Sequence, residues 1–337
     1  ERSMALNFKN LFNVGSDFCE ASILKLTRVD LRVFKKLQMF VHAESMQNIP
    51  EGDLTLFVRV GKDFTDNYYE YTIPLKQSDP DAMGAMNDPE QIWLKENMLD
   101  IDLSIFTDIK QQRNLEGGDF QELFPAQQNT NPERRAYIKG NPSLGYIKGI
   151  QIGVRNTSDS NTPLEGTVWV NELRMSGLDE RGGVAGLARM DLQMADLGNL
   201  TLSGAFSTIG YGALDQKLDA RQKESIQEYD VATNLELGKF LPSNFRISLP
   251  FYAQFAQSRS TPQFDPYDLD LTVREKIQSQ PAQRDEILDL AVDQTTIKTL
   301  NLTNVRKQRN PERDKKPMPW DISNFSASYS YTETEHR

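Results

Sequence analysis

Hydrophobic and polar residues alternate with a period of two along the second half of the chain. The clearest segment is FRISLPFYAQF, residues 245–255, in which every odd position is apolar. Successive side chains of a β-strand point to opposite faces, so this pattern predicts a strand with one apolar and one polar face. Pro250 lacks a backbone donor, which predicts an edge, a bulge or a kink there. Four further segments share the alternation: 187–196, 199–208, 229–240 and 324–332.

The apolar face of these segments could contact either lipid or a second layer of protein. A strand of about 11 residues is roughly 36 Å long, which a tilt of about 45° projects to roughly 26 Å. The apolar band of an outer-membrane barrel is about 25 Å tall. If the contact is lipid, the lipid-facing residues are Met190, Leu192, Leu202, Phe206, Leu235, Ile247, Leu249, Phe251 and Phe255. The residues facing a water-filled lumen are then Arg189, Asp191, Gln193, Ser203, Asn234, Glu236, Arg246 and Gln254.

Aromatic residues at the ends of these segments favour the membrane. Tyr329 and Tyr331, with Trp320 nearby, and Phe240 and Phe245 are placed as in the aromatic girdle of a barrel. The same residues would also suit a protein core. Alternation alone therefore leaves both interpretations open.

The first half of the chain has short strand-like segments separated by turns. Examples are KKLQMFVHAE, DLTLFVRVG, NYYEYTIPL, YIKGIQIGVRN and GTVWVNELRMSG. Strands at fairly regular spacing, enriched in β-branched and aromatic residues, predict a β-sandwich over residues 1–178. A short helix is expected near Ser104 or Thr107. Gly177, Gly182 and Gly183 predict a hinge, and residues 179–337 then form the second domain.

Long polar connections separate the alternating segments. DQKLDARQKESIQE is expected to be a helix that is polar all round, and PAQRDEILDLAVDQTT a helix with a narrow apolar stripe. Connections of this length are uncommon in a compact soluble domain. They are typical of one end of an outer-membrane barrel, where long loops oppose short turns.

Composition excludes several classes of function. The 337 residues carry a net charge of −10, which argues against nucleic-acid binding, and the basic run NVRKQRNPERDKK is interrupted by acids and expected to be a solvated loop. Cys19 is the only cysteine, so no internal disulfide can form. No apolar run approaches the length of about 20 residues that a spanning helix needs. The first residues show no signal peptide and the last stop inside an alternating run, so we expect a piece of a longer chain.

Candidate catalytic or metal-binding residues are few. The two histidines are His42, in an apolar segment and expected to be structural, and His336. With one cysteine beside them, they cannot assemble the usual zinc sites. Asp100 and Asp102 would share one face of a strand and are expected to be solvated rather than to bind Ca²⁺. We therefore expect no enzyme activity, no metal site and no cofactor.

Long segments of the chain resemble a known family. VWVNELRMSGLDERGGVAGLARMDLQMADLGNLTLSGAFSTIGYGALDQ, YDVATNLELGKFLP, SRSTPQFDPYDLD and KPMPWDISNFSASYSYTE are similar to the SprA/Sov family of the Bacteroidetes. ALNFKNLF, DLRVFKKLQMFVHAE, LFVRVGKDFTDNYYEYTIPL and WLKENMLDIDL also resemble it. The resemblance runs along nearly the whole chain, and the family's members are much longer.

This resemblance implies a fold, a place and partners. SprA-like proteins form the outer-membrane translocon of the type IX secretion system, a very large β-barrel that exports folded cargo proteins and is linked to gliding motility. The implied partners are a PorV-like outer-membrane shuttle barrel, a plug protein, secreted cargo proteins at the cell surface and outer-membrane lipid. The implied fold is all-β, with a jelly-roll-like β-sandwich followed by antiparallel strands of a large, incomplete transmembrane β-barrel.

A soluble protein is the alternative. An extracellular β-sandwich that binds glycans or partner proteins would need an exposed aromatic platform, for which Tyr68, Tyr69 and Trp93 are candidates. It would also need protein shielding both faces of the strands in the second half.

Overall fold

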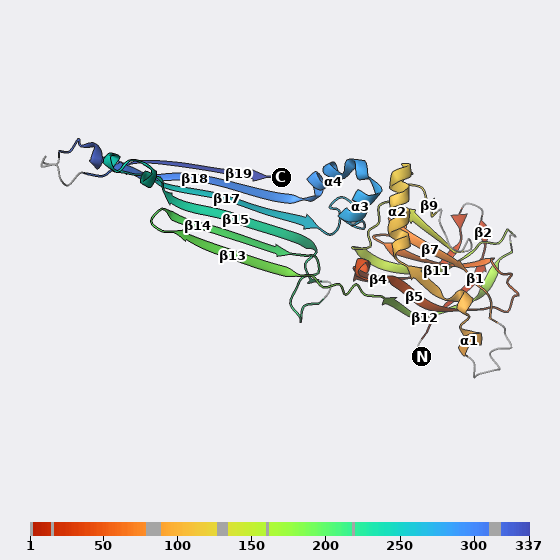
Figure 1. Ribbon diagram of the computed structural model, residues 1–337. Coiled ribbons are helices and arrows are strands. Elements are labelled where there is room, and N and C mark those ends of the chain that lie inside the picture. The colour runs from red at the N-terminus through yellow and green to blue at the C-terminus, as the bar shows by residue number, and fades with distance from the viewer. Residues whose placement is uncertain are drawn as a thin grey trace. The chain divides into compact units, whose positions relative to one another are not determined.

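The protein consists of two all-β units, which confirms the predicted fold class. The computed structural model describes residues 3–14, 17–78, 89–126, 134–159, 162–217, 220–309 and 318–337. The first unit comprises Glu1–Glu180 together with Asp268–Leu271, and the second comprises Arg181–Tyr267 and Thr272–Arg337. Figure 1 shows both units.

Two antiparallel sheets form the first unit. The smaller has the strand order β1-β12-β5-β8 and the larger β4-β11-β6-β7-β10-β9. The bounds of the smaller sheet are β1 Met4–Leu11, β12 Leu164–Ser176, β5 Lys36–Glu44 and β8 Leu99–Asp102. Those of the larger are β4 Glu20–Val29, β11 Ile147–Asn156, β6 Leu54–Gly61, β7 Tyr68–Pro74, β10 Arg135–Lys139 and β9 Phe124–Pro125. A short ribbon, β2 Asn13–Val14 with β3 Asp17–Phe18, lies outside both sheets.

The strand order is that of a jelly roll. The chain crosses between the sheets from β1 to β4, from β4 to β5 and from β5 to β6, so these consecutive strands lie in different sheets. The last two strands of the unit lie between strands that come earlier in the chain. β11 lies between β4 and β6, and β12 lies between β1 and β5. Two sheets interlocked in this way are the double Greek key of jelly-roll domains.

One hydrophobic core lies between these two sheets. Alternate residues of β5 point into it, and β6 contributes a matching set. The fully buried members are Leu37, Met39 and Val41 from β5 and Leu56, Val58 and Val60 from β6. Each such side chain stabilises the unit by about 1.5–3 kcal/mol relative to an exposed position. The alternation in the sequence is therefore explained here by a protein core.

Helix α2 (Ser104–Glu116) belongs to the first unit and packs against its core. Phe106 and Ile109 enter the core, and the Phe106 ring stacks on Tyr69 with centroids 5.0 Å apart. The helix ends at Gly117, whose φ of 68° is a left-handed conformation that glycine adopts without steric cost. The expected helix is thus present, and it begins at Ser104. The unit also contains α1, Pro89–Ile92.

The same unit buries an ion cluster built around a segment distant in sequence. The carboxylate of Asp270 accepts hydrogen bonds from Tyr69 Oη (2.6 Å), Lys110 Nζ (3.1 Å), Ser143 Oγ (3.1 Å) and the Leu144 N–H (2.7 Å). Lys110 Nζ also lies 2.7 Å from Asp268 Oδ1. Lys110 and Asp270 are almost completely buried. Burial and the adjacent Asp270 carboxylate raise the pKa of Tyr69 well above its usual value, so the phenol stays protonated and donates.

Asp63 organises the turn between β6 and β7. Its Oδ1 accepts the backbone N–H groups of Thr65 (3.2 Å), Asp66 (2.6 Å) and Asn67 (2.8 Å), and its Oδ2 accepts Asn67 Nδ2 (2.9 Å). Burial acts to raise the pKa of Asp63, but these hydrogen bonds outweigh it and lower the pKa to about 2. The charged form of Asp63 is therefore part of the folded turn.

A pH dependence follows from this turn. The folded-state pKa of Asp63 lies below the value of about 3.9 for an unfolded aspartate, so its stabilisation is complete above about pH 4 and disappears as the pH falls toward about 2. We expect the free energy of unfolding to differ between the natural chain and Asp63→Asn at pH 7 and to converge below pH 4. Urea unfolding of both proteins across this range measures it. A difference that stays constant with pH would show that the charge is not what matters.

A single extended antiparallel sheet dominates the second unit. Its order is β13-β14-β15-β17-β18-β16, with β19 also paired to β18. The bounds are β13 Ala185–Met194, β14 Gly198–Ser207, β15 Glu224–Glu236, β16 Ile247–Ser248, β17 Pro250–Pro262, β18 Asp293–Lys307 and β19 Ala327–His336. Figure 1 shows its long strands side by side. Helices α3 (Val273–Ser279) and α4 (Arg284–Ala291) lie in the connection from β17 to β18 and pack on each other through Val273, Ile287 and Ala291.

Several predicted segments in this unit differ from the structure. The segment 245–255 is not one strand: a 3-10 turn at Ser243–Phe245 precedes β16, and Pro250 begins β17. β15 starts at Glu224, so the part of DQKLDARQKESIQE from Glu224 onward is strand rather than helix. β18 was not expected, although its end covers the start of the basic run NVRKQRNPERDKK, of which residues 310–316 lie outside the described residues.

Candidate functional site

The two faces of the seven-stranded sheet are the candidate functional surface. Directly paired residues on neighbouring antiparallel strands point to the same face. The register therefore sorts every position of β13, β14, β15, β17, β18 and β19 into one of two sets. We name them by two adjacent residues of β14: the apolar face contains Leu202, and the polar face contains Ser203.

The apolar face carries the hydrophobic half of the alternation. A cross-strand row runs from Met190 through Leu202 and Val231 to Phe255. Seven of the nine residues predicted to face lipid lie on this face: Met190, Leu192, Leu202, Phe206, Leu235, Phe251 and Phe255. The other two lie outside the main strands, Ile247 in β16 and Leu249 between β16 and β17.

Side chains on the apolar face are exposed in this chain. Met190 is 51% exposed, Phe206 49% and Tyr229 45%. A large exposed apolar surface of this extent marks a contact with another protein or with a membrane. Tyr329 and Tyr331, two of the predicted girdle residues, are on this face as well, paired with Leu302 and Leu300.

Polar side chains on the opposite face bond to one another along and between strands. Arg189 Nε donates to Asp191 Oδ2 (2.9 Å), and Thr201 Oγ1 donates to Asp191 Oδ1 (2.8 Å). Gln254 Nε2 donates to Asp230 Oδ2 (2.5 Å). Seven of the eight predicted lumen-facing residues lie here: Arg189, Asp191, Gln193, Ser203, Asn234, Glu236 and Gln254. Arg246 does not, because it lies before β16 in a left-handed conformation with φ of 47°.

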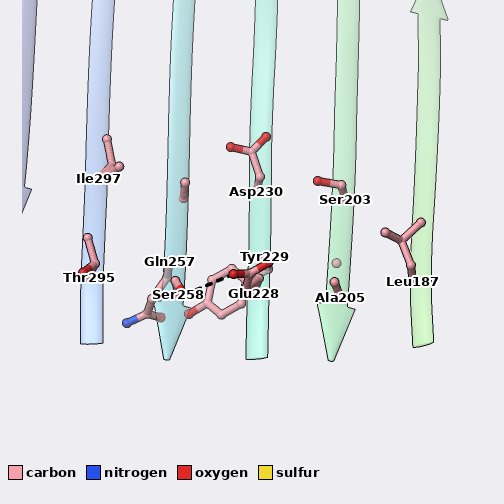
Figure 2. A pocket seen from close by; sticks show the side chains of 12 residues that line it. Leu187, Ser203, Ala205, Glu228, Tyr229, Asp230, Gln257, Ser258, Thr295 and Ile297 are labelled. Atoms are coloured by element: carbon pink, nitrogen blue, oxygen red, sulfur yellow. Dashed lines mark hydrogen bonds between the residues drawn. The ribbon is translucent and has the colours of Figure 1, made fainter. Parts of the chain in front are cut away.

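A shallow hollow of about 330 Å³ interrupts the polar face. Figure 2 shows the side chains around it, drawn from β13, β14, β15, β17 and β18. Ala205 and Ala256 leave space in its floor, Ser258 Oγ lies 3.4 Å from Glu228 Oε1, and Leu187 and Ile297 stand at its two ends. The described residues that line it include no histidine, cysteine, lysine or arginine. The lining mixes carboxylates and hydroxyls with the apolar side chains of Leu187, Ala205, Ala256 and Ile297.

Sequence reasoning missed part of this surface. β18 contributes Leu300 and Leu302 to the apolar face and Thr299 and Asn301 to the polar face. It escaped notice because Thr296 and Lys298 share the apolar face with the leucines, which weakens the alternation. Glu228 was missed because residues 224–228 were assigned to a helix, whereas β15 begins at Glu224.

Long connections between the strands occur at both ends of the sheet. The short link 195–197 and the longer segments 237–249 and 308–326 lie at one end, because consecutive strands are antiparallel. The segments 208–223 and 263–292 lie at the other end. The expectation that long connections occupy only one end is therefore wrong.

His42, in the first unit, is held by hydrogen bonds. Its Nδ1 lies 2.7 Å from the carbonyl oxygen of Ile92, which can only accept, so we assign the proton to Nδ1. Ser78 Oγ lies 2.9 Å from the same nitrogen. A protonated Nδ1 cannot take a proton from Ser78, so the pair is not arranged as base and nucleophile. His42 lines a cavity of about 710 Å³ at one end of the small sheet.

Other chemical candidates in the first unit are also structural or solvated. Asp100 and Asp102 are exposed, and Asp100 pairs with Lys36 at 3.1 Å. Within the described residues, no group of three or more His, Cys, Asp or Glu side chains is arranged to hold a metal ion. Tyr68 and Tyr69 are buried, so the proposed aromatic platform of a soluble glycan-binding sandwich is wrong for these two residues.

Comparison with known proteins adds one match. A family model described as "Motility related/secretion protein" matches residues 1–277, which include the strands of the first unit and β13 to β17 of the second. A comparison with curated proteins gives no significant match. Within the described residues, no helix is both long and apolar enough to cross a bilayer.

Proposed function

Because the chain belongs to the SprA N-terminal family of motility-related and secretion proteins, we propose that it contributes to a protein-export pore in the bacterial outer membrane. The second unit is part of the wall of a transmembrane β-barrel. The first unit is a jelly-roll domain carried by the same chain. The exported molecules are folded cargo proteins of the type IX secretion system.

The single observation that supports this proposal is the chemical difference between the two faces of one sheet. Apolar side chains cover the Leu202 face and are exposed, whereas carboxylates, amides and hydroxyls cover the Ser203 face and bond to one another. A barrel in a membrane needs this pairing, with lipid outside and water inside. A soluble sandwich would instead bury the apolar face under protein.

Export through such a wall requires no catalytic residue in it. A wide aqueous pore selects cargo by its diameter, the hydration of its lining and the gates that open and close it. The polar face suits this task because many of its side chains are carboxylates, amides and hydroxyls, several of which bond to one another. Energy for transport is then supplied elsewhere.

The finer parts of the proposal concern partners. We infer a PorV-like shuttle barrel that receives cargo, a plug protein that closes the pore, and a link to gliding motility at the cell surface. The description of the family as both motility-related and secretory supports the last of these. Outer-membrane lipid is the partner of the apolar face.

Cysteine accessibility on β17 tests the barrel wall. Single cysteines replace Phe251 and Phe255 on the apolar face and Tyr252 and Gln254 on the polar face, in cells that express the whole protein. We expect a membrane-impermeant maleimide to label positions 252 and 254, and a lipid-soluble maleimide alone to reach 251 and 255. Cys19 is free and exposed, so it is replaced by serine in all four variants and its own labelling does not mask theirs. Protection of 251 and 255 from both reagents would place them in a protein core and favour a soluble sandwich.

A further inference from the structure

The apolar face ends abruptly toward the end of the sheet that carries the connections 208–223 and 263–292. The position of this edge along the strand differs from one strand to the next. On each of the five strands β14, β15, β17, β18 and β19, the edge is the last apolar residue before the side chains of that face become polar. These residues are Phe206 on β14, Tyr229 on β15, Phe255 on β17, Leu300 on β18 and Tyr331 on β19, which together we call the boundary line.

The register shows that the boundary line crosses the strands obliquely. Phe206 pairs with the polar Gln227, and the apolar run of β15 starts two residues further along, at Tyr229. Tyr229 in turn pairs with Gln257, and the run of β17 starts two residues away, at Phe255. The edge therefore does not follow the hydrogen-bonded rows.

Phe255 pairs with Lys298, and the run of β18 starts two residues further, at Leu300. Leu300 pairs directly with Tyr331, beyond which β19 presents Glu333. Across four strand spacings the line has moved by six residues. That is about 20 Å along the strands against about 19 Å across them, an inclination of about 45°.

An oblique edge at this angle is what a flat bilayer imposes on tilted strands. Strands of outer-membrane barrels are inclined by about 35–45° to the membrane normal, so a plane parallel to the membrane cuts successive strands at shifted positions. If the edge of the apolar face followed the hydrogen-bonded pairing of the strands instead, the boundary line would run along one row, such as the row that joins Leu202, Val231 and Phe255.

The residue types on the boundary line agree with a membrane interface. Four of its five members are aromatic, and aromatic rings are enriched where hydrocarbon meets water. Tyr229 and Phe255 stack with ring centroids 6.1 Å apart, so neighbouring members of the line are in contact. Leu300 is the one aliphatic member.

On β18 and β19, charges begin immediately beyond the line. Lys298 is the next residue of β18 on this face, and its Nζ lies 3.5 Å from Glu333 and 3.4 Å from Glu335. Side chains with these charges are costly within hydrocarbon and are common in the headgroup layer. The hydrocarbon therefore has to end between Leu300 and Lys298.

We propose that the boundary line is the contact of this sheet with one interface of the bilayer, and that the strands cross the membrane at about 45° in the direction the line sets. This inference rests on the proposed function, because it requires the apolar face to contact lipid. The proposal identifies the residues that contact the lipid headgroups and those that lie deepest in the membrane. It also predicts that residues of one cross-strand row lie at different depths.

Depth measurements along one row test this directly. Met190, Val231 and Glu333 belong to a single row on the apolar face. Each is replaced by cysteine in turn, with Cys19→Ser, in the whole protein reconstituted in phospholipid vesicles, and carries a nitroxide label. Collision rates with oxygen and with a water-soluble nickel complex give the depth of each label. Ser203→Cys, on the polar face, is the control and should contact water.

The expected result is a gradient. Five strand spacings, about 24 Å across the sheet, separate Met190 from Glu333, which at about 45° corresponds to a depth difference of roughly 17 Å. Label 190 should be deepest, label 231 intermediate and label 333 in water. Equal depths for lipid-exposed labels would overturn the oblique line and leave the barrel wall standing. Labels that contact no lipid at any position would overturn both.

Discussion

Lys110→Met is expected to lower the free energy of unfolding of the first unit by about 3–5 kcal/mol, the cost of removing one partner from a buried ion pair. Lys110 Nζ is the cation beside both Asp268 (2.7 Å) and Asp270 (3.1 Å), and all three side chains are largely buried. Methionine keeps most of the volume but leaves the Asp268 and Asp270 carboxylates close together without the cation that both of them contact. Their repulsion and desolvation, rather than a cavity, cause the loss.

Urea unfolding followed by tryptophan fluorescence measures this loss in the 337-residue chain. Trp93 and Trp169 lie in the first unit, so a Trp320→Phe background makes the signal report on that unit. Lys36→Met is the matched control, because the exposed Lys36–Asp100 pair should contribute at most about 1 kcal/mol. Adding Asp270→Asn to Lys110→Met should recover part of the loss. Equal effects of the Lys110 and Lys36 substitutions would refute the ion cluster as a source of stability.

Leu202→Arg is expected to cost roughly 2–4 kcal/mol in the membrane-inserted protein, as charged side chains do near the middle of the bilayer. Leu202 lies four residues from Phe206 on β14, which is about 13 Å along the strand from the boundary line. At a tilt of about 45° it is roughly 9 Å below the interface, too deep for the arginine to reach the headgroups easily. Stability is measured by denaturant unfolding in lipid vesicles.

Ser203→Arg supplies the control for this prediction. Ser203 is the next residue of β14 and lies on the polar face, beside Asp230 and Arg189. An arginine there meets water and a carboxylate, so we expect little change in stability. If Ser203→Arg proves as costly as Leu202→Arg, both faces are buried in protein and the lumen assignment is wrong.

Much of the fold could be predicted from single segments of the sequence, because adjacent residues of a strand point to opposite faces. The alternation at Met190, Leu202, Leu235 and Phe255 places these side chains together whatever the neighbouring strand is. The all-β class followed from the same property. Prediction was poorest where local signals conflict, as in β18, whose apolar face mixes threonine and lysine with leucine, and at Pro250, which starts a strand instead of bending one.

The sequence by itself determined which residues share a face of each strand, because the period of two is a property of the extended backbone. Only the tertiary structure decided how the strands line up. Register depends on pairing between residues far apart in the chain, so the oblique course of the boundary line from Phe206 to Tyr331 could not be seen in any single segment. The same holds for Lys110 and Asp270, which are 160 residues apart and meet only because the folded unit brings Asp268–Leu271 to α2.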